Sequence, residues 1–223
     1  GVRFIGIETS NDDLYIKQGQ EFYPVAVPLY ENSAYYEADT FEGALQLFRK
    51  VETPEGMRYE TVVSAEIPKG VDTLLAVYLL APGEQPRLYF YNDSWSDFPG
   101  QSYRLINITP VVINSKVDET LFQVRPFQSE IVKVDIMSGL PLVRIITVYK
   151  DGYDQWKPIY NQRTALRRNW RITGISVITK GKLAQAQRIT TSGEDAGSGK
   201  ATLRYFSFKD TGPSRAVNAT PTQ

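Results

Sequence analysis

The chain has 223 residues and a formal net charge of zero, with 25 Lys and Arg residues against 25 Asp and Glu residues. It contains no Cys and no His, which excludes disulfides, thiolate and imidazole nucleophiles, and metal sites built from these side chains. The balanced charge provides no excess of cations to neutralise phosphates, so we expect no nucleic-acid partner.

Alternation of apolar and polar residues, the pattern of a half-buried strand, marks the first half of the chain. Turn sequences with Pro and Gly separate these segments, among them residues 53–56 (TPEG) and 68–70 (PKG). Residues 40–52 can also be interpreted as a helix, but the neighbouring segments favour a strand there. The predicted strands are residues 2–7, 22–30, 44–51, 58–67, 73–80 and 87–91.

A short acidic stretch follows the first predicted strand. Asn11, Asp12 and Asp13 offer clustered oxygen atoms, which hard cations such as Ca²⁺ prefer. The Gly and the terminal Glu of an EF-hand loop are missing, so we favour a solvated Asx-type turn, in which these side chains bond their own backbone. Calcium binding at these three residues stays an open question.

The strand pattern of the first half recurs about one hundred residues later. The segment DSWSDFPGQS at residues 93–102 then lies at the hinge between two copies of one strand series. Chance agreement among β-rich segments is the alternative. The aligned segments are 2–7 with 103–108, 22 onward with 121 onward, 45–50 with 144–150, 58–63 with 153–160, 73–80 with 171–178, and 88–93 with 204–210.

Short strands with Pro and Gly turns predict an all-β fold, and we expect two tandem Ig-like β-sandwich domains, with one larger β-sandwich as the alternative. The expected domains are residues 1–98 and 103–212, joined by a linker at residues 99–102. Residues 184–200 form an insertion rich in Gly, Ser and Thr, which we expect to be mobile, and we expect the tail at 213–223 to be disordered.

The stretch SWSDFPGQSYRLINIT, followed by LFQVRPFQSEIV, resembles a type of uncharacterised exported bacterial protein that is built from repeated Ig-like sandwiches. The resemblance covers most of residues 1–180. Some proteins of this type are associated with the cell surface or with pilus assemblies. The resemblance implies a fold and a location, and no catalytic residue follows from it.

Location is also an expectation from composition. A chain that lacks Cys, is rich in Tyr and starts at Gly1 fits an exported protein whose signal peptide has been removed, in the periplasm or at the cell surface. No apolar run approaches the length of a membrane-spanning helix, so we expect no transmembrane segment.

Five aromatic residues are candidates for an exposed contact surface. These are Tyr30, Tyr35 and Tyr36, together with Trp95 and Phe98 near the expected linker. Exposed aromatic rings suit protein interfaces or stacking on sugars. The alternative for Trp95 and Phe98, which we favour, is burial at the joint between domains.

A basic run at residues 163–171 (RTALRRNWR) is a candidate anion site. Its arginines, Arg163, Arg167, Arg168 and Arg171, could hold a phosphate or an acidic polysaccharide, because guanidinium groups bind such anions in a bidentate way. We favour the alternative that the run is an edge strand that charge protects from aggregation. The two tryptophans of this half, Trp156 and Trp170, are expected in the core.

Catalysis without His and Cys would need carboxylates, Lys or Tyr, and no spacing in the sequence pairs two carboxylates as a glycosidase requires. We therefore expect no enzyme and no cofactor. The expected function is that of a non-catalytic cell-envelope or surface protein acting through protein–protein or carbohydrate contacts, with another envelope protein or a surface polysaccharide as partner. A carboxylate-dependent hydrolase on a β scaffold is the alternative, and the sequence predicts no oligomeric state.

Overall fold

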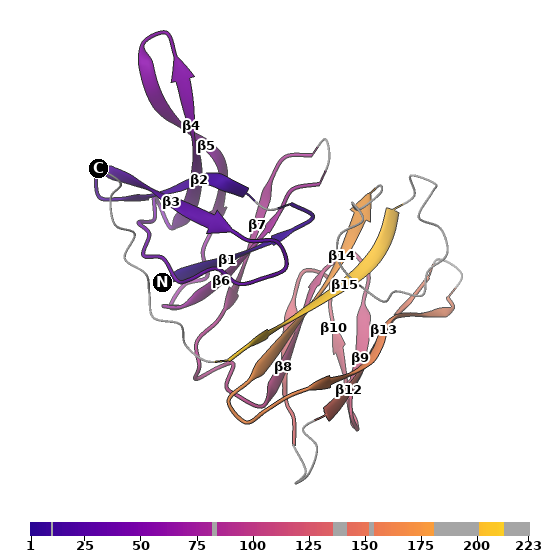
Figure 1. Ribbon diagram of the computed structural model, residues 1–223. Helices are drawn as coiled ribbons and strands as arrows, with labels where there is room; N and C mark the ends of the chain where they lie inside the picture. The colour runs from indigo at the N-terminus through magenta and orange to yellow at the C-terminus, as the bar shows by residue number, and fades with distance from the viewer. Residues whose placement is uncertain (10, 82–83, 136–141, 152–153, 181–200, 212–223) are drawn as a thin grey trace. The chain divides into compact units, whose positions relative to one another are not determined.

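The computed structural model describes residues 1–9, 11–81, 84–135, 142–151, 154–180 and 201–211. These residues form strands and turns and no helix, so the predicted all-β fold class is confirmed (Figure 1). The chain divides into two compact units, of which unit 1 contains Gly1–Asp97 and unit 2 begins at Phe98. The expected mobile insertion at 184–200 and the expected disordered tail at 213–223 lie outside the described residues.

Unit 1 is a β-sandwich with its core between two sheets. Phe4 and Ala76 of one sheet share a hydrophobic cluster with Leu14 and Leu47 of the other, and all four side chains are buried. One sheet has the order β1 (Val2–Ile7), β6 (Leu74–Leu79), β7 (Arg87–Asn92), and the other has the order β3 (Glu21–Val27), β2 (Asn11–Gln18), β4 (Ala44–Thr53), β5 (Gly56–Glu66).

The strand β2 was not predicted, because its first residues read as a turn. The backbone N–H of Asp13 does donate to Asn11 Oδ1 at 3.0 Å, which is the local bond expected of an Asx-type turn. The bond lies inside a strand, however, at an irregularity in the pairing with β3 between Asn11 and Leu14. From Leu14 onward the strand alternates regularly, with Leu14 and Ile16 buried in the core.

Unit 2 is built in the same way around its own core. Tyr103, Ile145, Ile159 and Tyr205 are buried in one cluster to which both sheets contribute. One sheet has the order β11 (Ser129–Lys133), β8 (Ser102–Ile108), β14 (Arg171–Lys180), β15 (Ala201–Asp210), and the other has the order β10 (Thr120–Val124), β9 (Ile113–Val117), β12 (Leu142–Lys150), β13 (Trp156–Ala165).

The expected linker at 99–102 is bound into unit 2. Ser102 is already the first residue of β8. The N–H of Gln101 donates to the carbonyl of Trp170 at 2.7 Å, and the carbonyl of Gln101 accepts from the N–H of Val134 at 2.8 Å.

The strand orders of the two units correspond. In each unit the first strand, β1 or β8, runs parallel to β6 or β14, which pairs antiparallel with β7 or β15. In the other sheet, β3-β2-β4-β5 corresponds to β10-β9-β12-β13. The place of β11 beside β8 is taken in unit 1 by residues 28–36, which form isolated bridges with Val2 and Gly6 of β1.

The pairing registers correspond as well. In each unit, one residue near the start of the first strand pairs with a residue of the central strand, which in turn pairs with a residue of the last strand. The three residues of one unit lie at the same positions as the three residues of the other. The hairpins β4–β5 and β12–β13 also share an irregularity, because one extra residue, Val62 in β5 and Ile159 in β13, interrupts the pairing at the same place. The matching trios are Val2–Leu74–Asn92 and Tyr103–Ile172–Lys209.

Candidate functional site

Tyr35 is not an exposed contact residue, so this prediction is wrong. Its side chain is 7% exposed, and its hydroxyl donates to Asp93 Oδ2 at 2.5 Å. The same carboxylate oxygen lies 2.6 Å from Nε of the buried Arg3, whose guanidinium carbon is 5.0 Å from the centre of the Tyr35 ring. A buried carboxylate requires hydrogen-bond and ion-pair partners. Tyr35 is buried because it is one of the partners of Asp93.

The other aromatic candidates of unit 1 are half-buried. Tyr36 packs against the core, where its ring centre is 6.0 Å from that of Phe4 and its hydroxyl accepts from the N–H of Ala26 at 3.1 Å. Tyr30 has a positive φ of 58° and donates its N–H to the carbonyl of Gly6. Trp95 is also half-buried. Tyr35 and Tyr36 therefore lie in different surroundings and form no joint surface.

Phe98 and Arg171 are buried together in unit 2, so the candidate roles of Phe98 in an exposed contact surface and of Arg171 in an anion site are wrong. The burial of Phe98, which the sequence analysis favoured, agrees with the structure. The guanidinium of Arg171 binds Asp210 Oδ2 through Nε at 2.9 Å and Nη2 at 2.8 Å, and its Nη1 donates to the Phe98 carbonyl at 2.9 Å. The guanidinium carbons of Arg104 and Arg171 lie 4.3 and 4.8 Å from the centre of the Phe98 ring. Arg171 is thus occupied by internal partners.

The remaining arginines of the basic run are exposed and lie in different elements. Arg163 belongs to β13, an edge strand of its sheet, as the interpretation of charged edge protection requires. Arg167 and Arg168 follow the end of that strand, and Arg167 lies over the ring of Trp170 at 4.8 Å. The run is therefore not one continuous edge strand.

The two tryptophans differ from each other. Trp170 is half-buried and packs against the core cluster of unit 2, as expected. Trp156, at the start of β13, is 52% exposed, so its prediction as a core residue is wrong. The Lys150 ammonium lies 5.4 Å from its ring centre. Trp156 starts the edge strand, and the first buried side chain of this strand is Ile159, which packs in the core.

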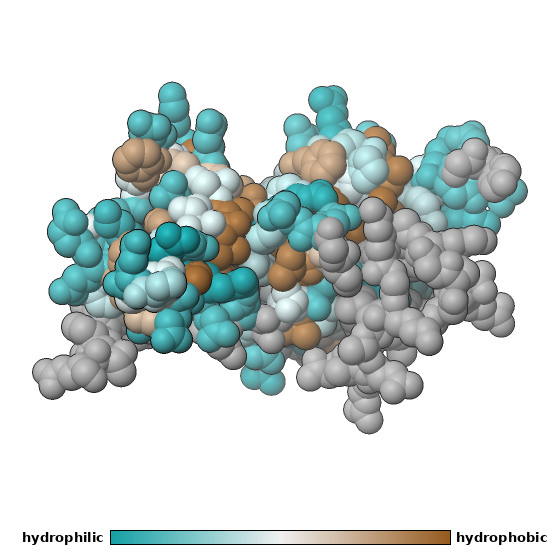
Figure 2. All heavy atoms as spheres, turned by 90° about the horizontal axis from the view of Figure 1, so that it is seen from above, coloured by the Kyte–Doolittle hydropathy of each residue, from teal (hydrophilic) through white to brown (hydrophobic). Residues whose placement is uncertain are grey.

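Exposed apolar side chains are distributed over the surface. On the face shown in Figure 2, hydrophobic residues form patches among hydrophilic residues. The large exposed hydrophobic residues among those described are Phe41, Met57, Val112, Leu121, Phe127, Leu142 and Trp156.

Four aromatic rings contact one another on one sheet of unit 1, and we call Tyr15, Phe22, Phe48 and Tyr59 the aromatic face. They come from the four strands β2, β3, β4 and β5. The rings of Phe22 and Tyr59 stack with centres 3.9 Å apart and planes 5° from parallel. Phe22 also meets Phe48 edge-on at 5.0 Å, and Tyr15 meets Tyr59 edge-on at 5.1 Å.

The aromatic face lies on the side of the sheet that points away from the core. Tyr15 alternates with the core residues Leu14 and Ile16, and it pairs directly with Phe48. Tyr15, Phe22 and Tyr59 remain half-exposed, whereas Phe48 is 9% exposed beneath them. The four rings form a partly exposed apolar surface.

Two lysines flank the aromatic face. Lys17 pairs with Phe22, and Lys50 pairs with Tyr59, so each lysine side chain lies on the same side of the sheet as its aromatic partner. Within the described part of the chain, neither lysine forms an ion pair. The surface thus combines aromatic rings with two available positive charges.

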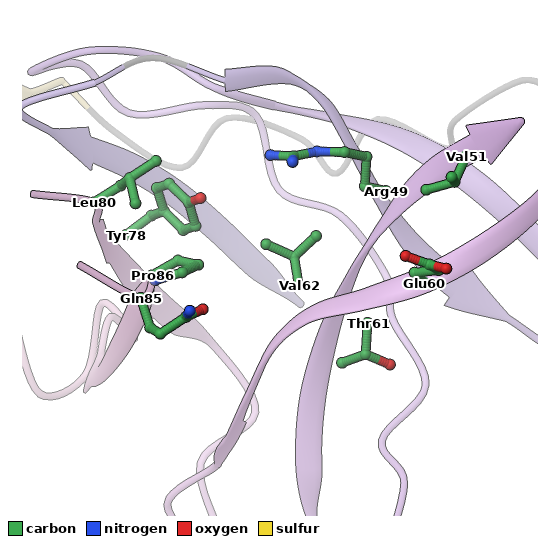
Figure 3. Close-up of a pocket in the computed structure, with 9 residues that line it drawn as sticks. All are labelled: Arg49, Val51, Glu60, Thr61, Val62, Tyr78, Leu80, Gln85 and Pro86. Carbon is green, nitrogen blue, oxygen red and sulfur yellow. The ribbon is translucent and has the colours of Figure 1, made fainter. Parts of the chain in front are cut away.

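A cavity of about 370 Å³ opens at the edge of unit 1 between β4, β5 and the end of β6 (Figure 3). Its walls carry apolar side chains from β4, β5, β6 and the segment before β7. Arg49 extends over Val62 towards the hydroxyl of Tyr78. The lining residues are Arg49, Val51, Glu60, Thr61, Val62, Tyr78, Leu80, Gln85 and Pro86.

Tyr78 and Arg49 are donors in this cavity that lack partners in the described structure. Tyr78 is fully buried, and its hydroxyl forms no hydrogen bond with any described residue. Burial raises the pKa of Tyr78, whereas the Asn11 side chain, which lies near the hydroxyl without meeting the geometry of a hydrogen bond, and the charge of Arg49 lower it. The guanidinium of Arg49 forms neither an ion pair nor a hydrogen bond among the described residues, whereas Glu60 on the rim is paired with Arg58.

Sequence reasoning missed both surfaces. The alternation in the predicted strand 22–30 put Phe22 on the side away from Val25 and Val27, which was a usable signal. The alternation in 58–67 put Tyr59 on the core side with Val63, and only the extra residue Val62 turns it outward. The strand of Tyr15 was not predicted. Tyr78 lay in an apolar run, TLLAVYLL, in which no pattern distinguishes a hydroxyl without a partner from an ordinary core tyrosine.

The described residues have neither clustered metal ligands nor a membrane-spanning helix. They contain no cluster of three or more Asp and Glu residues suited to a metal ion, and the side chain of Asp12 lies outside the described set. In the same part of the chain, no helix has the length and apolar character needed to cross a bilayer. No protein-family model matches the sequence, and a search of curated proteins finds no match.

Proposed function

We propose that the protein is a non-catalytic cell-envelope or surface protein that acts through protein–protein contacts made by the aromatic face. The observation that carries this proposal is the cluster of four contacting rings on the outer side of the sheet β3-β2-β4-β5. Aromatic side chains are enriched at protein interfaces because they bury large areas with little loss of side-chain entropy.

The packing of the rings favours a protein partner over a carbohydrate. Phe22 and Tyr59 stack on each other at 3.9 Å, so each ring covers one face of its neighbour. A sugar that stacks on an aromatic residue needs an open ring face, whereas an apolar protein surface can pack against exposed ring edges as well. Carbohydrate contact through Tyr15, whose contact with Tyr59 is edge-on, is the second candidate.

The charges around the aromatic face indicate the chemistry of the partner. Lys17 and Lys50 flank the rings and form no ion pair among the described residues. Complementary charge steers association and suppresses wrong partners. We therefore expect a partner, most simply another envelope protein, that presents an apolar patch bordered by carboxylates.

The proposal also includes the origin of the two units as copies of one Ig-like module. Matching strand orders, matching registers and an extra residue at the same place in two hairpins support it. The cross-strand pair Tyr78–Leu88 of unit 1 matches the pair Ser176–Tyr205 of unit 2. The tyrosine lies on the central strand in unit 1 and on the last strand in unit 2, so each pair combines one tyrosine with a smaller residue. An exported location rests on composition and on the resemblance described above.

The proposal is tested by comparing two double variants of the full chain. Tyr15→Ser/Tyr59→Ser removes two rings of the aromatic face. Leu121→Ser/Trp156→Ser removes two exposed apolar side chains from the corresponding sheet of unit 2 and serves as the matched control. Each immobilised protein is incubated with envelope proteins and, separately, with surface polysaccharide from the cells of origin.

The expected result is a loss of about tenfold in retained envelope protein for Tyr15→Ser/Tyr59→Ser, because aromatic residues dominate binding energies at interfaces. The control variant should retain as much as the wild type, and thermal melts should show that both variants are folded. Equal retention by both variants would contradict a contact at the aromatic face. Loss of polysaccharide retention alone would favour the carbohydrate alternative.

A further inference from the structure

We propose that the cavity between β4, β5 and the end of β6 is a binding site for a small carboxylate with an apolar body, held by Arg49 and Tyr78 (Figure 3). This inference is independent of the contact proposed for the aromatic face, because Arg49 projects from the opposite side of β4 to Phe48. The volume of the cavity, about 370 Å³, is within the range of sites that bind small ligands.

The strongest indication of a ligand is the hydroxyl of Tyr78. This side chain is fully buried at the cavity wall, and its hydroxyl finds no hydrogen-bond partner among the described residues. Buried polar groups without partners are rare in native proteins, because their desolvation is not compensated. A ligand oxygen in the cavity would accept this hydrogen bond.

Arg49 specifies the charge of the ligand. Its guanidinium is directed across the cavity towards Tyr78, and it has no ion-pair partner in the described part of the chain. Glu60 stands opposite Arg49 in the neighbouring strand, yet its carboxylate binds Arg58. A guanidinium binds a planar carboxylate through two parallel N–H groups, and the phenol of Tyr78 adds a third donor.

The remaining walls specify the body of the ligand. Val51, Val62, Leu80 and Pro86 contribute apolar surface to the cavity wall, and Glu60, Thr61 and Gln85 contribute polar surface. Apolar walls with a few convergent donors are typical of small-molecule sites. An aliphatic acid of moderate length can pack on the four apolar side chains, which offer no hydrogen bonds to the hydroxyl groups of a polyhydroxylated acid such as a uronic acid.

The experiment is a titration of the purified full chain, followed by the amide and Arg side-chain signals in ¹H–¹⁵N NMR spectra. The probes are hexanoate, its neutral analogue hexanamide, and glucuronate. Arg49→Gln removes the charge, Tyr78→Phe removes the hydroxyl and keeps the ring, and Arg163→Gln is the matched control. Arg163 is an exposed arginine of β13 in unit 2 and does not line the cavity.

Hexanoate should shift signals of Val62 and Leu80 and bind at least about tenfold more tightly than hexanamide or glucuronate. Arg49→Gln and Tyr78→Phe should each weaken hexanoate binding by about tenfold, since each removes a hydrogen bond to a charged acceptor. Arg163→Gln should bind as the wild type does. Hexanamide binding equal to that of hexanoate, or unchanged affinity in both cavity variants, would overturn the proposal, and tighter glucuronate binding would overturn the apolar body assigned to the ligand.

Discussion

At the scale of single residues, the most demanding feature is the pairing of buried charges. Arg3 and Asp93 are 2% and 0% exposed, and the Asp93 carboxylate also accepts from Tyr35. Removal of one partner from such a pair leaves an uncompensated buried charge, which is far more costly than the loss of an exposed pair.

Asp93→Asn should lower the free energy of unfolding by about 3 kcal/mol, because Arg3 keeps its charge and loses its counter-ion. Urea denaturation followed by circular dichroism measures the change. Glu60→Gln, which breaks the exposed pair with Arg58, is the control and should cost less than about 1 kcal/mol. Equal effects of the two substitutions would show that the Arg3–Asp93 pair is not buried as described.

For Tyr78→Phe in the ligand-free protein, we expect the opposite change in the free energy of unfolding. The hydroxyl is buried without a partner among the described residues, so its removal should raise the free energy of unfolding by about 1 kcal/mol. The comparison is Tyr103→Phe, which removes a hydroxyl that lies 3.0 Å from the Tyr205 hydroxyl and should destabilise the protein. A clear destabilisation by Tyr78→Phe would reveal a hydrogen bond at that hydroxyl.

At the scale of elements, Gly174 in β14 shows how a strand adapts to its neighbours. A Cβ atom at this position would lie 2.6 Å from the Tyr103 hydroxyl oxygen and 2.5 Å from that of Tyr205. Gly in a strand interior often marks such a close approach. The corresponding position of unit 1 is Ala76, where the last strand contributes Leu88 in place of a tyrosine.

Gly174→Ala should therefore lower the free energy of unfolding by about 1–3 kcal/mol through overpacking. The same substitution should cost less in a Tyr205→Leu background, in which one of the two clashing hydroxyls is absent and the pair matches Ala76 and Leu88 of unit 1. Denaturation curves of the wild type, the two single variants and the double variant test both statements. A neutral Gly174→Ala substitution, or an equal cost in both backgrounds, would argue against the packing described.

The buried pair Tyr103–Tyr205 also predicts a dependence on pH. Burial raises the pKa of both phenols, and for Tyr205 the charge of Tyr103 adds to this rise. Because the folded pKa values exceed the unfolded value of about 10, the unfolded chain loses protons first, and stability should fall as the pH rises through about 10. The fall should be less steep in Tyr103→Phe/Tyr205→Phe, as measured by urea denaturation across this range, and equal steepness would contradict the assignment.

Local patterns predicted the strands well, and they failed where burial depends on distant partners. The segment 2–7 matches β1, and the other five strands predicted in the first half all occur, with shifted ends. Tyr35 was misjudged because its partner Asp93 is 58 residues away, and Arg171 because Asp210 is 39 residues away. The hydrophobic periodicity of strands and helices, two and 3.6 residues, carries no information about contacts between residues so far apart in the sequence.

At the scale of the whole molecule, the sequence indicated the class of fold and little of the candidate sites. The aromatic face joins residues from four strands, and the cavity joins Arg49 of β4 to Tyr78 of β6, so both require the sheet order as well as the strand positions. That order follows from long-range pairing and packing, which local propensity does not determine. The strand β2, which the sequence did not predict because it begins with acidic residues, carries Tyr15 of the aromatic face.

Site-specific photo-crosslinking tests the proposed contact most directly. A photo-reactive phenylalanine analogue replaces Tyr59 in the full protein in its own cells, and the same analogue replaces Trp156 as a control, since Trp156 is an exposed aromatic residue on the corresponding sheet of unit 2. We predict that irradiation yields a discrete adduct with a second protein from position 59 and little or none from position 156. An equal yield of the same adducts from both positions, or no adduct from position 59, would contradict the account.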